Sequence, residues 1–254
     1  MSAPPILAVT GLRAEARIAA GTGVMTVAGG GDPARLALLL QAALARGARA
    51  VISFGIAGGL EPGLAPGSVL IARAVHHGGL RTETASAWVV RLAAALPGAR
   101  IADIAGVDAA VVGAADKTAL HRRTGAAAVD MESHVASRLA ALHGLPFAAL
   151  RVVADPAERS LPPAALVGMR PDGTTDIGAV LRSLGRAPRQ LPGLIRTGLD
   201  ARAAFSALKA SRLDLAPLFD IGGGLREDSF DLAAEFETGF EAALGRDPAE
   251  VRAG

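Results

Sequence analysis

Residues 51–72 read VISFGIAGGLEPGLAPGSVLIA, and this stretch is the most informative one for predicting the fold. Its first four residues form a short apolar run that is typical of a buried strand. The glycine-rich segment 55–59 predicts a turn, and residues 68–72 predict another strand after Pro66-Gly67. The stretch therefore predicts two strands of a sheet, joined by glycine backbone that a ligand can approach closely.

Strand-like and helix-like segments alternate on both sides of this stretch. Buried strands are expected over residues 6–9, 24–28, 101–104, 111–112, 127–129 and 147–154, and helices over residues 33–46, 87–96, 115–122 and 132–143. The alternation predicts the α/β class, as a three-layer αβα sandwich with a mixed, mostly parallel central sheet. In such folds ligands bind beyond the carboxyl ends of the strands.

The C-terminal part of the chain has a different character. Residues 177–213 are predicted to be helical and basic, whereas the chain from residue 226 onward is acidic. We expect residues 1–220 to form a single α/β domain that includes the basic helical segment, and residues 221–254 to form an acidic tail of uncertain order. The basic stretch has two interpretations: a solvated face of helices that close the domain, or a contact with an anionic membrane surface.

Composition excludes several classes of protein. With 51% hydrophobic residues the chain is too apolar for wholesale disorder, and the absence of cysteine excludes a disulfide scaffold, a cysteine nucleophile and a cysteine metal site. A formal net charge of only +2 and 3% aromatic residues argue against nucleic acid as a partner. His76 and His77 have no carboxylate at ligand spacing, so we expect no metal. No targeting segment and no apolar run of bilayer length stand out, so we expect a cytoplasmic protein.

Three blocks of sequence resemble one known family. Residues 51–72, the block AAVDMESHVA at residues 127–136 and the block LRVVADP at residues 150–156 are similar, in order and spacing, to the nucleoside phosphorylases and the 5'-methylthioadenosine/S-adenosylhomocysteine nucleosidases. The opening VTGLRAEARIA at residues 9–19, the loop GGGDP at residues 29–33 and the basic C-terminal part resemble the hopanoid-associated branch of that family. This branch consists of adenosylhopane nucleosidases, which release adenine from a nucleoside attached to a triterpenoid.

The resemblance assigns roles to the two last blocks. Breaking an N-glycosidic bond needs a leaving base that accepts a proton, and a buried carboxyl at a strand end can donate it. The resemblance implies that Asp155 is this acid, that Glu132 accepts hydrogen bonds from the ribose hydroxyls and that Met131 packs on the sugar face. Structural alternatives stay open: Asp155 before Pro156 can cap a loop, and Glu132 can favour the start of a helix.

The resemblance also implies contacts from three other segments. It places Glu15 as the group that positions the attacking water, and the alternative for this residue is an exposed glutamate at a helix start. Gly55, Ala57 and Gly58 would lie against the ribose and the base, and Val111 would offer the base an aliphatic contact. The alternative for the glycines is a tight turn without a ligand.

The nucleophile is water or phosphate. Ile56 stands where phosphorylases often have a serine or threonine that contacts phosphate, and no arginine lies just upstream, which favours water. Arg13, Arg35 and the glycine loop around Gly30 are the candidates for holding an anion. Apart from inorganic phosphate as a co-substrate, this chemistry needs no cofactor.

The sequence therefore predicts an enzyme that cleaves the N-glycosidic bond of an adenine nucleoside with a bulky 5' substituent, with adenosylhopane as the expected substrate. The alternatives are cleavage of methylthioadenosine or S-adenosylhomocysteine, a purine nucleoside phosphorylase, and a nucleoside-binding protein without turnover. The partner is a small-molecule or lipid-linked nucleoside. The family implies a homo-oligomer, and a lipid-linked substrate would bring the protein to the inner membrane surface.

Overall fold

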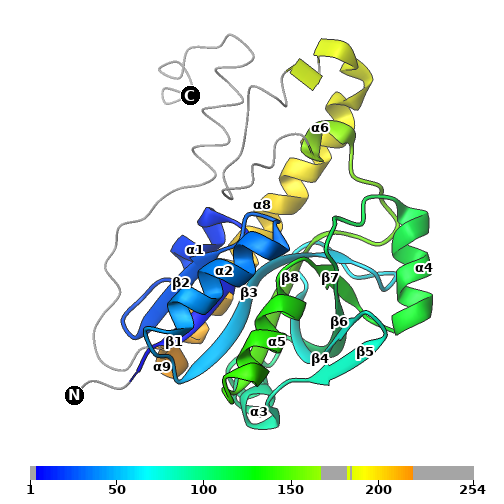
Figure 1. Cartoon of the computed structure of the whole chain (residues 1–254). Helices are drawn as coiled ribbons and strands as arrows, with labels where there is room; N and C mark the ends of the chain where they lie inside the picture. The colour runs from blue at the N-terminus through cyan, green and yellow to red at the C-terminus, as the bar shows by residue number, and fades with distance from the viewer. Residues whose placement is uncertain (1–3, 167–181, 184, 220–254) are drawn as a thin grey trace.

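The computed structural model describes residues 4–166, 182–183 and 185–219, in which strands and helices alternate (Figure 1). The strands are β1 (Ile6–Thr10), β2 (Val24–Ala28), β3 (Ala50–Gly59), β4 (Val69–His77), β5 (Leu80–Glu83), β6 (Arg100–Gly106), β7 (Ala128–Asp130) and β8 (Phe147–Asp155). The helices are α1 (Arg13–Ala19), α2 (Pro33–Leu44), α3 (Ser86–Ala95), α4 (Ala114–Thr124), α5 (Ser133–Leu142), α6 (Pro163–Leu166), α8 (Leu191–Asp214) and α9 (Ala216–Phe219), with a 3-10 turn over Pro188–Gln190.

The strands of this described part form one sheet. Their order is β2-β1-β3-β7-β6-β4-β5, and β8 pairs with both β3 and β4. Five pairings are parallel and three are antiparallel, which confirms the mixed, mostly parallel sheet. Because β8 joins β3 to β4 while β6 and β7 lead from β4 back to β3, these five strands close a circuit. The sheet is therefore curled like a small barrel around its middle.

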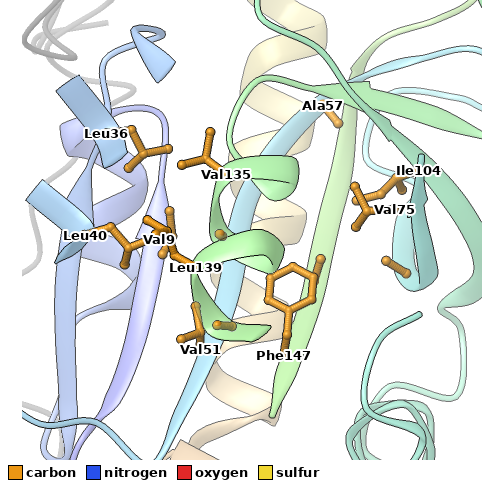
Figure 2. Packing of buried hydrophobic residues seen from close by; sticks show 14 of the residues in the cluster. Val9, Leu36, Leu40, Val51, Ala57, Val75, Ile104, Val135, Leu139 and Phe147 are labelled. Carbon is orange, nitrogen blue, oxygen red and sulfur yellow. The ribbon is translucent and has the colours of Figure 1, made fainter. Parts of the chain in front are cut away.

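Helices cover both faces of the sheet, as a three-layer fold requires. On one face, Leu36 and Leu40 of α2 and Leu139 of α5 belong to one apolar cluster with Val9 and Val51 of the strands (Figure 2). The opposite face carries α1, α3 and α8, whose buried residues join a separate cluster with the strands: Ala19, Leu92, Ala204 and Leu208. The predicted αβα arrangement is confirmed, and α8 packs against the sheet on this second face.

Local contacts explain where α2 starts and how the end of α8 is held. The Asp32 carboxylate accepts hydrogen bonds from the backbone of Ala34 and Arg35 at 2.9 and 3.0 Å, and Pro33 follows as the first residue of α2. At the end of α8, the buried Arg212 donates from Nε to the carbonyl oxygen of Ala19 at 3.1 Å. None of the described helices is long and apolar enough to cross a bilayer.

The structure corrects two of the predicted elements and adds others. The glycine segment 55–59 is not a turn, because β3 continues through it to Gly59 and pairs with β8 along its length. Residues 111–112 form no strand, and β5 was not expected. The predicted acidic tail over residues 221–254 and part of the basic segment lie outside the described residues.

Candidate active site

Glu15 is buried at the carboxyl end of β1. It lies in the first turn of α1 and is 2% exposed. Its Oε2 accepts hydrogen bonds from the backbone N–H groups of Gly11 and Leu12 at 2.8 and 2.7 Å, and its Oε1 accepts one from Ile56 at 2.8 Å. Burial raises the pKa of this carboxyl, although Arg151 and the three backbone donors act in the opposite direction. The alternative of an exposed glutamate at a helix start is wrong.

Arg151 gathers a second group of carboxylates beside Glu15. Its guanidinium, 1% exposed, contacts Asp130 Oδ2 at 2.7 Å through Nε and Glu132 Oε2 at 3.3 Å through Nη2. Asp130 has a structural task here, because its Oδ1 accepts from the backbone of Glu132 and Ser133 at 3.1 and 2.8 Å. Asp130 therefore fixes the turn that leads into α5 and aims Glu132 at the guanidinium.

Glu132 and Glu15 converge on the same backbone segment. A Cβ placed on Gly11 would lie 2.7 Å from Glu132 Oε1 and 3.4 Å from Glu15 Oε2. Burial raises the pKa of Glu132 to about 8, since the attraction of Arg151 is opposed by the charges of Asp130 and Glu15. The two carboxylates predicted for water and ribose therefore lie together. We name Glu15, Asp130, Glu132 and Arg151 the carboxylate cluster.

Asp155 ends β8 and lies further along β3. Its register partner is Gly58, where the pairing shifts by one residue, and a Cβ on Gly58 would lie 3.4 Å from both carboxylate oxygens. Burial raises the pKa of Asp155, and Lys117 acts against this effect. Glu15 meets β3 at Ile56, so two residues of strand, about 7 Å at 3.3 Å each, separate the two contact points on β3.

Three of the residues predicted to touch the substrate have other neighbours. A Cβ on Gly55 would lie 2.5 Å from Glu15 Oε1 and 2.7 Å from Arg151 Nη1, so the space beside this glycine is filled by the protein itself. Ala57 is buried in the apolar core (Figure 2). Val111 packs against a third apolar cluster near α4, and Met131 is half-buried. Substrate contact by these side chains stays a prediction.

The groups predicted to hold phosphate are engaged in the loop itself. The N–H of Gly30 donates to the carbonyl oxygen of Gly11 at 2.8 Å. Arg35 Nη1 donates to the carbonyl oxygens of Ala28 and Gly29 at 3.3 and 3.0 Å, and Arg13 is exposed on α1. These bonds brace the loop after β2, and phosphate binding here stays a prediction.

The histidines near β4 form contacts that the sequence did not indicate. His76 Nε2 lies 2.8 Å from Asp103 Oδ2, whereas His77 stacks on His134 with ring centroids 4.1 Å apart and planes 20° apart. His134 Nε2 lies 2.9 Å from Asp108 Oδ1, and one ligand atom from each of His77, Asp108 and His134 falls within 4.8 Å of the others. The trio forms a hydrogen-bonded stack, in which the nearly parallel rings do not aim their in-plane lone pairs at one point, and the expectation of no metal stays a prediction.

Sequence reasoning missed two residues, Arg151 and Lys117. Arg151 stands inside the block LRVVADP, but a charged residue within an apolar strand signals function only when its partners are known. Lys117 is fully buried and contacts Asp155 from α4. No spacing rule connects residues 117 and 155, because the pair forms only when α4 packs beside the end of β8.

The structure is an α/β fold whose buried acids lie near the carboxyl ends of its strands, the region where ligands bind in folds of this class. The sequence model of the family described as "Phosphorylase superfamily" matches residues 9–184. This chain belongs to that superfamily.

Similar proteins agree with this assignment. Futalosine hydrolase of Streptomyces coelicolor is 31% identical over 167 residues, which are 58% of this chain and 66%, just under two thirds, of that protein. Among solved structures, futalosine hydrolase of Helicobacter pylori aligns with a TM-score of 0.58 and 15% identity over 84% of this chain and 99% of that one. S-adenosylhomocysteine nucleosidase from Streptococcus pyogenes aligns with a TM-score of 0.61 and 15% identity over 84% and 98%. At these identities the structures show a shared fold.

Proposed function

We propose that this protein is a nucleosidase that hydrolyses the N-glycosidic bond of a purine nucleoside. The observation that carries the proposal is the placement of three buried carboxyls: Glu15 and Glu132 come together beside Gly11, and Glu15 and Asp155 contact β3 two residues apart, at Ile56 and Gly58. The names of the similar proteins, a hydrolase and a nucleosidase, support the same reaction.

Glu15 has the environment of a general base. A carboxylate offers about four lone-pair sites, and three of those on Glu15 accept backbone N–H groups. The site that remains is on Oε1, the oxygen with a single donor, and there it can accept a hydrogen bond from water. A raised pKa makes the group a stronger base near neutral pH. The water oxygen attacks the anomeric carbon and its proton passes to Glu15.

Asp155 acts on the other side of the bond. Its buried carboxyl donates a proton to the base nitrogen as the carbon–nitrogen bond breaks, so the base leaves neutral and Asp155 is left as a carboxylate. Glu132 accepts hydrogen bonds from the two ribose hydroxyls and holds the sugar between the acid and the water. The products are the free base and the ribosyl compound, and protons balance when Glu15 returns its proton to Asp155 through solvent.

The charge of the carboxylate cluster favours water over phosphate. Within the described residues, the cluster sets three carboxylates against the single guanidinium of Arg151, whose contacts are with them. A phosphate ion beside Glu15 would bring a buried negative charge, and the one cation of the cluster is already paired with Asp130 and Glu132. Water carries no such penalty, and phosphorolysis is therefore the second candidate.

For the 5' substituent we propose a bulky apolar group, with adenosylhopane as the first candidate. In its support, α8 exposes Leu191, Ile195 and Leu199 at intervals of four residues, which places them on one face of the helix. Arg189 and Arg196 are exposed beside them, as on a helix that contacts an anionic lipid surface. Futalosine is the second candidate, because the 31% identical relative is a futalosine hydrolase.

The test is incubation of the purified protein with adenosine, methylthioadenosine, futalosine and a lipid-linked adenosine, each with and without phosphate. We expect free base from at least one of them, a ribose product without phosphate, and the same rate when phosphate is added. Asp155→Asn should lower kcat by about 10²- to 10⁴-fold. Release of a ribose-1-phosphate product would show that phosphate, and not water, is the nucleophile. Binding of a nucleoside without release of base would contradict the proposal that the protein is a nucleosidase.

Co-sedimentation with vesicles tests the surface contact separately. We expect binding to anionic vesicles at low salt, and weaker binding when Ile195 and Leu199 are both changed to Ser. No binding at low salt would remove the membrane contact and leave the hydrolysis proposal unaffected.

A further inference from the structure

Lys117 is buried within reach of the proposed general acid. It lies on α4, its side chain is 0% exposed, and its Nζ donates to Asp155 Oδ2. The same Nζ donates to the carbonyl oxygens of Pro156 and Arg159, each at 3.0 Å. An ammonium group has three donors and no acceptor, and here all three donors meet acceptors. The surroundings of Lys117 therefore match a charged lysine.

The contact makes the two oxygens of Asp155 different. Oδ2 accepts a hydrogen bond from Lys117, so a proton on that oxygen would point at another donor and be repelled by it. Within the described residues, no side chain or backbone group donates to Oδ1, and the side chain of Asp155 is 16% exposed. A neutral Asp155 therefore carries its proton on Oδ1, the oxygen left for a ligand.

We propose that Lys117 is the positioning residue of the general acid: it directs the acidic proton to Oδ1 of Asp155 and stabilises the carboxylate that remains after the proton has moved to the base. This role rests on the proposed hydrolysis of a nucleoside. It assigns a part in the reaction to a residue outside the blocks that resemble the family.

The other charges near Asp155 leave this task to Lys117. Asp200 on α8 and Arg159 after β8 both act on Asp155, but they pair with each other at 2.6 Å, so their opposite charges largely cancel at the acid. Burial raises the pKa of Asp155, which favours the protonated acid, and Lys117 limits that rise, which favours release of the proton. Removal of the ammonium charge should therefore make Asp155 a weaker acid.

A simpler role for Lys117 is to fasten the segment after β8 to α4 through the two carbonyl oxygens. Lys117→Met keeps the length and apolar stem of the side chain and removes the charge, and Lys117→Arg keeps the charge. Lys209→Met is the matched control, because Lys209 is the other lysine of the chain and is exposed on α8. The structural role and the positioning role differ in the pH dependence that they predict.

The experiment measures kcat and KM against pH for the wild type and these variants, with the nucleoside that the wild type cleaves fastest. For Lys117→Met we expect kcat to fall about 10- to 100-fold, less than for Asp155→Asn because the acid is still present. KM should stay within about threefold, and the basic limb of the kcat profile should move to higher pH, because the pKa of Asp155 rises without the ammonium. Lys117→Arg should restore most of kcat and the position of the limb, and Lys209→Met should match the wild type.

Two results would overturn the proposal while leaving the proposed function intact. One is an active Lys117→Met protein with the kcat and basic limb of the wild type. The other is a variant whose kcat, KM and thermal midpoint all deteriorate with no shift of the limb and no rescue by arginine, which would make Lys117 a purely structural residue. If the wild type releases no base from any nucleoside, the hydrolysis and this role fall together.

Discussion

Glu132→Gln should make the protein more stable at neutral pH while it removes sugar binding. Glu132 is buried, with a pKa raised to about 8 by burial and by the neighbouring carboxylates, even though Arg151 attracts it. In the unfolded chain the same group titrates near 4.5. The folded state thus binds this proton more tightly than the unfolded chain does. The contribution of this proton to stability is fully present below pH 4.5 and is lost as the pH rises toward 8.

The size of the effect follows from the difference between these two pKa values. Each pH unit between them costs about 1.4 kcal/mol of stability, so the ionisable side chain costs up to about 4 kcal/mol at pH 7.5. Glutamine has the same shape and no charge to desolvate. The pKa of Glu132 already includes the attraction of Arg151, so the loss of this attraction in the variant brings no further change in stability.

Urea unfolding of both proteins at several pH values between 5 and 8 measures the difference. We expect the two free energies of unfolding to agree near pH 5 and to separate progressively in favour of Glu132→Gln, while the variant loses binding of the nucleoside. Glu83→Gln is the control, because this exposed glutamate should leave the pH dependence unchanged. If the two plots of unfolding free energy against pH are parallel, or if the variant is equally destabilised at every pH, then burial does not raise the pKa of Glu132.

Three other perturbations test the packing around the site. Gly55→Ala puts a Cβ within 2.7 Å of two buried charged groups and should cost about 2–4 kcal/mol by urea unfolding, whereas Gly98→Ala, with no atom within 4 Å of the new Cβ, should change stability by less than about 0.5 kcal/mol. Leu208→Ala removes a fully buried side chain that packs α8 against the sheet and should cost about 2–5 kcal/mol in the same assay; a smaller loss would mean that α8 is not held by its apolar face. Asp103→Asn should destabilise the protein at pH 7 but not near pH 2, because burial of Asp103 is outweighed by its hydrogen bonds with neighbouring cations, which lower its pKa to about 2; its stabilising contribution is lost as the pH falls from 3.8 toward 2.

The sequence predicted the layers of this fold because its local signals agree with one another. Asp32 before Pro33 marks the start of α2, and Gly47 after the leucine-rich run marks where it has ended. Short apolar runs separated by such helices allow few arrangements other than a covered parallel sheet. The same reasoning placed Asp155 at the end of a strand and Glu132 at the start of a helix, where the structure has them.

The glycines of β3 show where local reasoning fails. Gly55-Ile56-Ala57-Gly58-Gly59 has the composition of a turn, but its pairing with β8 and, at Gly58 and Gly59, with β7 keeps it extended. Gly55 is required because Glu15 and Arg151 occupy the space of its missing side chain. Both groups come from distant parts of the chain, so the reason for the glycine is invisible until the strands are paired.

The two halves of the proposed reaction are separated by the same physical means. Glu15 accepts hydrogen bonds from three backbone N–H groups, and the positive charge of Arg151 acts on it as well as on the other carboxylates. All of these neighbours are donors or positive charges, so the environment suits a carboxylate that accepts a proton from water. Asp155 has a cation of its own in Lys117 and one oxygen without a protein donor among the described residues, an environment in which a proton can be held and released. Two carboxyls that both resist ionisation through burial therefore differ in what surrounds them, and this difference assigns base and acid. The base and the acid also have separate cations beside β3: Arg151 next to Glu15, and Lys117 next to Asp155. A single shared cation would couple the ionisation of the acid to that of the base, and neither role would be fixed.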